Sequence, residues 1–511
     1  MQLLFLDYII FLVFILSVGI YVWVDSKKHH TIEEYFLSGR RMTWPIIGLS
    51  LVASNISSEH FVGMAGEGYK IGLPIASYEW TASLVMVVVA LFVLPKFMRA
   101  GIYTLPEYLE YRYGKTTRLL VSIFMLLMYV FVLIASVLYS GALAVFNVFG
   151  LFDKSVYIIV IGLIALMFTV YGGLYSVMRT NVVFGIALLA GGAATMIVGV
   201  VYLGGFDEFT QHSSGKLHSL LPADNKELPW TNVMLGALWI LHLNYWAVNQ
   251  FITQHSLATS SLSEGQKGIL FAATIKLFIP FVIVFPGVIA FELFEGAEIK
   301  PDDVYASLMS LLVPHGMKGI LLCILMGAVL STLHSMIHAA SMIFTLDIYK
   351  RYIRQQASEN QIVNTGKIFA SILVFFSCLW AVVVFESFEV GIYRYIQILW
   401  GLVAPSFVII FLFGFIVKRA TEKAANYVIF LNPIIYIQLL FFFPKTPFLD
   451  LMGITFVFLL IIFVLLTLYE PLQNPPMIPE RFNVKFERNL LVFIWGIFIF
   501  LGTLMLYVVF L

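Results

Sequence analysis

The sequence predicts an all-α polytopic membrane protein with about fourteen transmembrane helices. Of its 511 residues, 61% are hydrophobic and only 12% are charged, whereas a soluble protein has about 45–50% apolar and about 25% charged residues. Apolar runs of about 20 residues, the length that crosses a bilayer as a helix, recur along the chain. The net charge of +1 gives no reason to expect nucleic acid as a partner. Cys323 and Cys378 both lie in apolar segments, so no disulfide framework is expected.

The first apolar run, residues 5–24, is expected to remain in the protein as a helix. No basic residue precedes it, and no cleavage site of small residues follows it. The other predicted spans are residues 43–61, 74–95, 119–149, 155–178, 181–205, 233–255, 268–294, 317–347, 366–385, 393–417, 425–443, 448–469 and 489–511.

The Lys and Arg residues of the connecting loops predict the orientation. With the N-terminus outside, the inner loops contain 21 of the 30 Lys and Arg residues and the outer loops contain 8. Inner loops of membrane proteins are enriched in these residues. We therefore expect a multi-pass protein of a plasma membrane, specifically a bacterial inner membrane, with both termini outside.

The second span contains a polar run, Ala53 to His60, in which only Ile56 is apolar after the alanine. The run predicts an interrupted helix whose free carbonyls line a cavity. The alternative is a polar helix cap at the outer interface, but the run begins about ten residues into the span, near mid-membrane.

The span at 317–347 carries a second polar element, Gly327 to Thr332. Hydroxyls in transmembrane helices most often bond back to their own helix. Combined with carbonyls from the interrupted helix, however, Ser331 and Thr332 would complete a set of about five neutral oxygen ligands, which suits Na⁺ better than a divalent ion. His334 and His338 have the i, i+4 spacing of metal ligands, but no third ligand is near in sequence, so no further metal site is expected.

Three ionisable residues fall at membrane depth: His60, Glu79 and Lys276. Buried charges in a bilayer normally face a wet cavity or each other. One interpretation is a Glu79–Lys276 pair that only clamps two helices together. The functional interpretation adds nearby amides and aromatic rings, which together with the charges suit a polyhydroxylated ring; these neighbours are Asn55, Tyr78, Trp80, Tyr245, Trp246 and Gln397.

The chain contains no phosphate-binding loop of the GxxxxGK[ST] type, so active transport would have to use an ion gradient. We find no nucleophile–base pair and no metal cluster, and do not expect an enzyme.

Several motifs, in the same order along the chain, resemble those of the sodium:solute symporter family, within it most closely the sodium/glucose cotransporter branch. The resemblance extends from about residue 30 to 420. The matching stretches are Asn55–Met64 with Gly68–Tyr69, Ala76–Trp80, Gly101–Glu110, Tyr171–Leu174, Asn244–Trp246, Lys267–Ile269 and Thr345–Lys350.

The resemblance implies a LeuT-like fold of two inverted five-helix repeats, with extra flanking helices and a broken helix at the start of each repeat. Applied to this chain, it divides the sequence into an extra N-terminal helix with an inner loop (1–42), a first repeat (43–205), an outer loop (206–232), a second repeat (233–417) and extra C-terminal helices (418–511).

The resemblance also implies site residues. The Na⁺ ligands would be the carbonyls of Ala53, Ile56 and Ala328 and the hydroxyls of Ser331 and Thr332. The substrate-binding residues would be Asn55, His60, Glu79, Trp246, Lys276 and Gln397, with Tyr245 as the inner gate and Met64, Tyr78 and Tyr393 as outer gates.

Three positions depart from the family pattern. The family often has Thr-Asp where this chain has Thr180-Asn181, and the Asp is linked to a second sodium in some relatives, so one Na⁺ per sugar is expected. His242 and Ala82 stand where a galactose-transporting relative has Asn and Ser, which leaves the identity of the sugar open.

The resulting prediction is a secondary active transporter that couples inward Na⁺ movement to the uptake of a glucose- or galactose-like monosaccharide by alternating access. The oligomeric state is not predicted. Other Na⁺-coupled solutes stay open: inositol, a sialic-acid-like anion, an organic acid or an amino acid. An anion would require excess positive charge, yet Glu79 offsets Lys276. A sensor or channel is less favoured, because we expect a sensor to carry a signalling domain.

Overall fold

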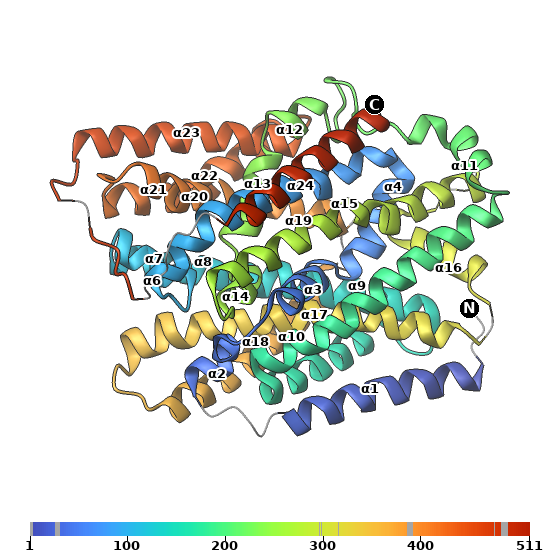
Figure 1. Ribbon diagram of the computed structural model, residues 1–511, viewed down its shortest axis with the longest axis horizontal. Coiled ribbons are helices and arrows are strands. Elements are labelled where there is room, and N and C mark those ends of the chain that lie inside the picture. Colours follow the sequence, from blue (N-terminus) through green and yellow to red (C-terminus); the bar gives the residue numbers. More distant parts are fainter. Residues whose placement is uncertain are drawn as a thin grey trace.

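The computed structural model describes residues 4–25, 31–295, 297, 299–314, 316–385, 392–474, 476–481 and 489–511. Four of the basic residues used for the orientation, Lys27, Lys28, Lys485 and Arg488, lie outside these ranges. The described chain is a bundle of helices whose long axes run roughly together, with α1 along one edge and α22 and α23 along the opposite edge (Figure 1).

Ten helices in the described part of the chain are long and apolar enough to cross a membrane, or eleven when the bent pair formed by α19 and α20–α21 is included. The all-helical fold class is therefore confirmed. The long single helices are α1 (Phe5–Asp25), α15 (Leu262–Leu293), α17 (Lys318–Ile343), α18 (Glu359–Phe385), α22 (Glu422–Phe442), α23 (Phe448–Tyr469) and α24 (Leu490–Val509).

Two further spans consist of helices that continue through a π-turn, α5 (Ser77–Val88) into α6 (Leu94–Ala100) and α8 (Lys115–Met128) into α9 (Ala135–Phe149). The bent pair consists of α19 (Ile392–Trp400), α20 (Ala404–Val408) and α21 (Gly414–Ile416), with a bend of 49°. Short helices lie in the connections: α2 (Ile32–Leu37), α7 (Leu105–Arg112), α11 (Phe206–His212), α12 (Trp230–Met234) and α16 (Val304–Leu312).

The segment α10 (Lys154–Tyr202) holds two predicted spans that turn back on each other at Gly173. Gly173 has φ 57° and ψ −175°, a conformation that is essentially restricted to glycine. Phe168 before the turn packs on His334, and the Asn181 amide after it lies 3.5 Å from Ser335 Oγ. The two halves therefore reach the same level of α17, which a straight helix could not achieve.

Two helices are broken, and they begin the two predicted repeats. The first consists of α3 (Trp44–Asn55), a short π-turn and α4 (Ala65–Ile71). The second consists of α13 (Leu238–Ala247) and α14 (Gln250–Leu257), separated at Val248 and Asn249. Both lie near the centre of the bundle, surrounded by longer helices (Figure 1).

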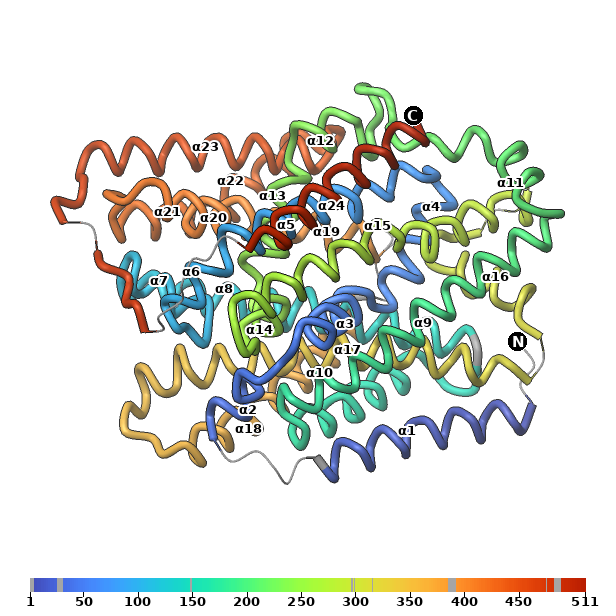
Figure 2. Tube along the Cα trace, viewed as in Figure 1, coloured from blue at the N-terminus to red at the C-terminus, as the bar shows by residue number. Residues whose placement is uncertain are grey.

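Both chain ends lie toward the same end of the bundle (Figure 2). The Gly319 amide donates to Asp7 Oδ1 at 2.7 Å, and the Ser219 amide donates to the Phe510 carbonyl at 2.6 Å. Residue 219 falls in the predicted outer loop 206–232, and residue 319 lies at the start of the predicted span 317–347, just after an outer loop. An even number of membrane crossings accounts for this placement of the two chain ends. That they lie on the outer side stays a prediction.

Candidate functional site

The break in the first helix lies at Ile56 and Ser57. Ile56 has φ −85° and ψ 103°, which is extended rather than helical backbone. The whole run from Ala53 to His60 is buried and helix resumes after it, which favours an interrupted helix over a polar cap at the outer interface. A buried break is tolerated because the freed backbone groups meet polar partners on neighbouring helices.

One of those partners is α17. The Ser331 hydroxyl lies 2.6 Å from the Ala53 carbonyl oxygen and 2.9 Å from that of Ala328. The Thr332 hydroxyl donates to the Ser54 carbonyl at 3.1 Å. Four of the five predicted ligand positions thus meet where α3 and α17 touch, and the fifth, Ile56, is at the break itself. The donor set is neutral oxygen only, which fits a monovalent hard cation.

A chain of polar side chains continues from the end of α3. Lys276 Nζ on α15 donates to Glu79 Oε2 on α5 at 2.5 Å and to Asn55 Oδ1 at 2.7 Å. Asn55 Nδ2 in turn donates to the Tyr245 hydroxyl at 3.0 Å. His60 Nε2 lies 3.8 Å from Glu79 Oε1. The buried ammonium is thus paired with a carboxylate and an amide rather than left alone.

Aromatic rings surround this chain of contacts. Lys276 Nζ sits 4.9 Å from the centre of the Trp246 ring, a cation–π distance. The rings of Tyr78 and Tyr393 meet edge-on at 5.5 Å, and His60 meets Tyr393 at 6.3 Å. These rings and the polar chain enclose one cavity with about 60 Å³ of water-accessible space, several times what one water molecule needs.

The structure brings nearly all the predicted substrate and gate residues to this cavity. Its lining includes Asn55, His60, Tyr78, Glu79, Tyr245, Trp246, Lys276, Tyr393 and Gln397. Met64 is fully buried but is not among the lining residues. Trp80 points elsewhere: its indole N–H donates to the Leu277 carbonyl at 3.1 Å, and its ring packs against Tyr507.

Sequence reasoning did not single out Glu59 and Trp400, which also line the cavity. Glu59 lies inside the polar run, and that run was the signal that could have found it; its Oε1 accepts from Ser136 Oγ at 3.3 Å. Trp400 has no such signal, because it is one of many aromatic residues in apolar spans. His242 lines the cavity and lies 2.8 Å from Thr81 Oγ1 through its Nε2 atom.

A second buried polar cluster lies one helical turn from the Ser331 and Thr332 hydroxyls. Asn181 Nδ2 donates to Ser54 Oγ at 2.9 Å, and His255 lies 3.0 Å from Ser50 Oγ and 3.1 Å from Ser54 Oγ. Ser335 Oγ completes the cluster and bonds to the Ser331 carbonyl at 2.9 Å. None of these five side chains is a carboxylate. Within the described residues, no group of three His, Cys, Asp or Glu side chains is placed to hold a metal ion.

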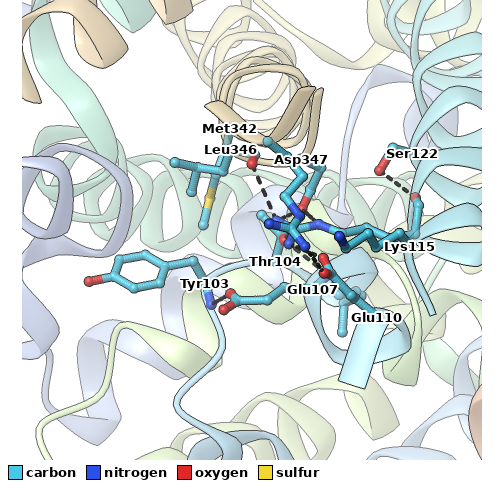
Figure 3. Close-up of polar contacts among 12 residues, drawn as sticks. Tyr103, Thr104, Glu107, Glu110, Lys115, Ser122, Met342, Leu346 and Asp347 are labelled. Atoms are coloured by element: carbon cyan, nitrogen blue, oxygen red, sulfur yellow. Dashed lines mark hydrogen bonds and ion pairs between the residues drawn. The ribbon is translucent and has the colours of Figure 1, made fainter. Parts of the chain in front are cut away.

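An ionic network ties the π-turn at Phe344–Ile353, which follows α17, to α7 and α8 (Figure 3). Asp347 Oδ1 accepts from Thr104 Oγ1 and from Arg118 Nε, each at 2.7 Å. Arg118 also donates to Glu110 at 2.6 Å, and Arg351 bonds to the same carboxylate. These contacts join α7 and α8 to the chain that follows α17, at the end of the bundle predicted to be inside.

A smaller ionic network lies at the end of the bundle predicted to be outside. Glu227 pairs with Lys70 at 2.9 Å and with Arg394 at 2.6 Å. Partial burial alone would raise the pKa of the Glu227 carboxyl, but hydrogen bonds and charges from both cations hold that pKa below its ordinary value.

The comparisons with known proteins agree with this geometry. The sequence profile described as "Sodium:solute symporter family" matches residues 35–430. The chain is 33% identical to the sodium/glucose cotransporter of Vibrio parahaemolyticus, over 98% of this chain and 97% of that one. It is 31% identical to the sodium/myo-inositol cotransporter of Mus musculus, over 82% of this chain and 64% of that protein.

Solved structures agree on the fold. A Na⁺-coupled sialic acid symporter superposes with a TM-score of 0.82 at 21% identity, covering 93% of this chain and all of that one. A nucleobase-cation-symport-1 family transporter superposes with a TM-score of 0.56 at 15% identity, covering 86% of this chain and 96% of that one. These LeuT-like neighbours are transporters rather than enzymes. Na⁺ is the coupling ion, and this chain belongs to the sodium:solute symporter family.

Proposed function

We propose that this Na⁺-coupled symporter takes up a neutral polyhydroxylated solute, specifically a glucose- or galactose-like monosaccharide. The observation that carries the proposal is the cavity around the buried Glu79 and Lys276, in which the carboxylate balances the ammonium. Carboxylate and amide oxygens accept from hydroxyls, and the Trp246 and Tyr245 rings offer flat apolar faces to a sugar ring.

The charge balance favours a neutral solute over an anion. A sialic-acid-like or organic anion needs an unpaired cation to offset its desolvation, and Lys276 is already within 2.5 Å of Glu79. Myo-inositol stays the second candidate, because it is a neutral polyol too and a sodium/myo-inositol cotransporter is among the relatives.

The coupling ion is assigned to the oxygens between α3 and α17, namely Ala53, Ile56, Ala328, Ser331 and Thr332. Bound Na⁺ would hold α3 against α17 and so fix Asn55, two residues after Ala53, in the substrate cavity. Solute binding then favours closure of the outer gate formed by Tyr78, Tyr393 and Met64. Loss of Na⁺ to the inside would loosen α3 and allow Tyr245, the inner gate, to move away.

One Na⁺ per solute is proposed from the Asn181 cluster. A second desolvated cation would need a compensating anion, whereas the amide of Asn181 and the imidazole and three hydroxyls around it include no carboxylate. We further propose that residues 43–205 and 233–417 act as the two inverted repeats, in a bacterial inner membrane with both termini outside.

Uptake by proteoliposomes from a labelled panel of glucose, galactose, myo-inositol and sialic acid tests the proposed function. An inward Na⁺ gradient should drive accumulation of a neutral hexose, and replacing Na⁺ by K⁺ should abolish it. Selective accumulation of sialic acid would overturn the neutral-solute proposal, and selective accumulation of myo-inositol would move the assignment to the second candidate.

The double variant Ser331→Ala/Thr332→Ala tests the Na⁺ site. It removes both hydroxyl ligands and leaves only carbonyls, so the apparent Na⁺ affinity in uptake assays should weaken at least about tenfold, if each contact matches a hydrogen bond to a charge. The control is Thr365→Ala/Ser371→Ala, whose hydroxyls bond back to the exposed face of α18. Unchanged Na⁺ dependence in a folded Ser331/Thr332 variant would remove the site from the proposal.

A mutant cycle separates solute binding by Glu79 from a purely structural clamp. Lys276→Met alone leaves a buried carboxylate unpaired and should cost about 3–5 kcal/mol of stability. The double variant Glu79→Gln/Lys276→Met should recover most of that thermal stability. Sugar affinity should nevertheless stay weaker by about 10- to 150-fold, because a hydrogen bond to a charged group is lost. Normal sugar binding by the stable double variant would show that Glu79 and Lys276 only hold two helices together.

A further inference from the structure

A separate cavity opens at the end of the bundle that carries most of the basic loops. It lies between α6, α7 and α21 and has a volume of about 490 Å³. Four cationic side chains line it, Lys96, Arg99, Arg112 and Lys418, against a single carboxylate, Glu480. We call it the basic cavity.

A neighbouring cavity at the same end of the bundle offers an internal comparison. It measures about 790 Å³ and is lined by four cations and four carboxylates: Arg118, Lys350, Arg351 and Arg481 with Glu33, Glu107, Glu110 and Glu359. Its charges largely pair with one another, as Arg118 with Glu110 and Arg481 with Glu107. The cations of this neighbouring cavity are therefore matched by an equal number of carboxylates, and those of the basic cavity are not.

Contacts hold the cations of the basic cavity in place, and in the part of the chain that the structure describes only Arg99 of these four pairs with a carboxylate. Arg112 donates to three backbone carbonyls at the end of α21, those of Gly414, Val417 and Ala420, at 2.6–3.1 Å. Lys96 Nζ sits 3.9 Å from the centre of the Phe415 ring. Among the described residues, neither Lys96 nor Lys418 has a carboxylate within ion-pairing distance, and Arg99 reaches Glu480 at 3.4 Å.

The other walls of the basic cavity are apolar. They include Phe415, Met477 and Ile478. Met477 is 96% exposed, although a methionine gains nothing from contact with water. Cationic and accessible apolar side chains thus lie side by side near Ala100, where α6 ends. This combination suits a ligand that has an anionic headgroup and a hydrocarbon tail.

We propose that the basic cavity binds the headgroup of an anionic phospholipid, with the phosphate near Lys96 and Lys418 and an acyl chain along Phe415 and Met477. The flexible lysines would act as point charges on the phosphate, and Arg112 would supply a fixed positive field behind them. This site is separate from the solute cavity and does not depend on what the protein transports.

Native mass spectrometry of the purified full chain tests the proposal, with phosphatidylglycerol and phosphatidylcholine as the probes. The variant Lys96→Gln/Lys418→Gln removes two charges from the basic cavity. The control Lys350→Gln/Lys423→Gln removes two at the same end, from the balanced cavity and from an exposed pair with Glu470. The unmodified chain should retain phosphatidylglycerol in preference to phosphatidylcholine. Its affinity for phosphatidylglycerol should fall about thirtyfold in the first variant, because each lysine near an anionic lipid contributes about fivefold.

Three other outcomes would contradict the proposal. Equal loss of phosphatidylglycerol in both variants would show attraction by overall charge only and would overturn the site. Displacement of the lipid by millimolar inorganic phosphate would show a soluble-anion site and would overturn the lipid assignment. Retention of phosphatidylglycerol by the first variant, at the level of the control, would also contradict the proposal.

Discussion

An ammonium or a carboxylate at membrane depth costs several kcal/mol unless it is paired, and this constraint determines how the centre of the molecule is assembled. Lys276 on α15 can be accommodated because Glu79 on α5 lies within 2.5 Å and the Asn55 amide within 2.7 Å. These contacts fix three helices relative to one another. They also set the end of α3 at the point where its backbone leaves the helix, so the ion pair and the broken helix support each other.

The broken helix places the proposed ion and solute sites next to each other. Ser331 reaches the Ala53 carbonyl, while Asn55, two residues along the same helix, reaches Lys276 and Tyr245. Thr332 belongs to both regions, since its hydroxyl donates to Ser54 and the residue lines the solute cavity. A shift of α3 against α17 would disturb both sites together. Two ligands are coupled when both bias the equilibrium of one such two-state element.

Much of this arrangement could be predicted from sequence, for physical reasons. The spans follow from composition. The polar run at Ala53–His60 stands out because a continuous membrane helix satisfies its own backbone and gains nothing from polar side chains, whereas an interrupted helix needs polar partners. The direction of individual side chains is harder to predict: Trp80 is adjacent to Glu79 in sequence, yet a helix turns by about 100° per residue and directs it away from the cavity. Partners distant in sequence are harder still. Arg118 and Asp347 are 229 residues apart, and only the assembled fold brings them together.

The central claim is that movement of one Na⁺ through the site between α3 and α17 drives movement of one solute molecule. The reversal potential of solute-coupled Na⁺ flux in proteoliposomes measures this ratio directly. The account predicts a coupling ratio of one, because the hydroxyls, imidazole and Asn181 amide of the neighbouring cluster provide no carboxylate for a second cation. A measured ratio of two, or a reversal potential that does not respond to the Na⁺ gradient, would contradict it.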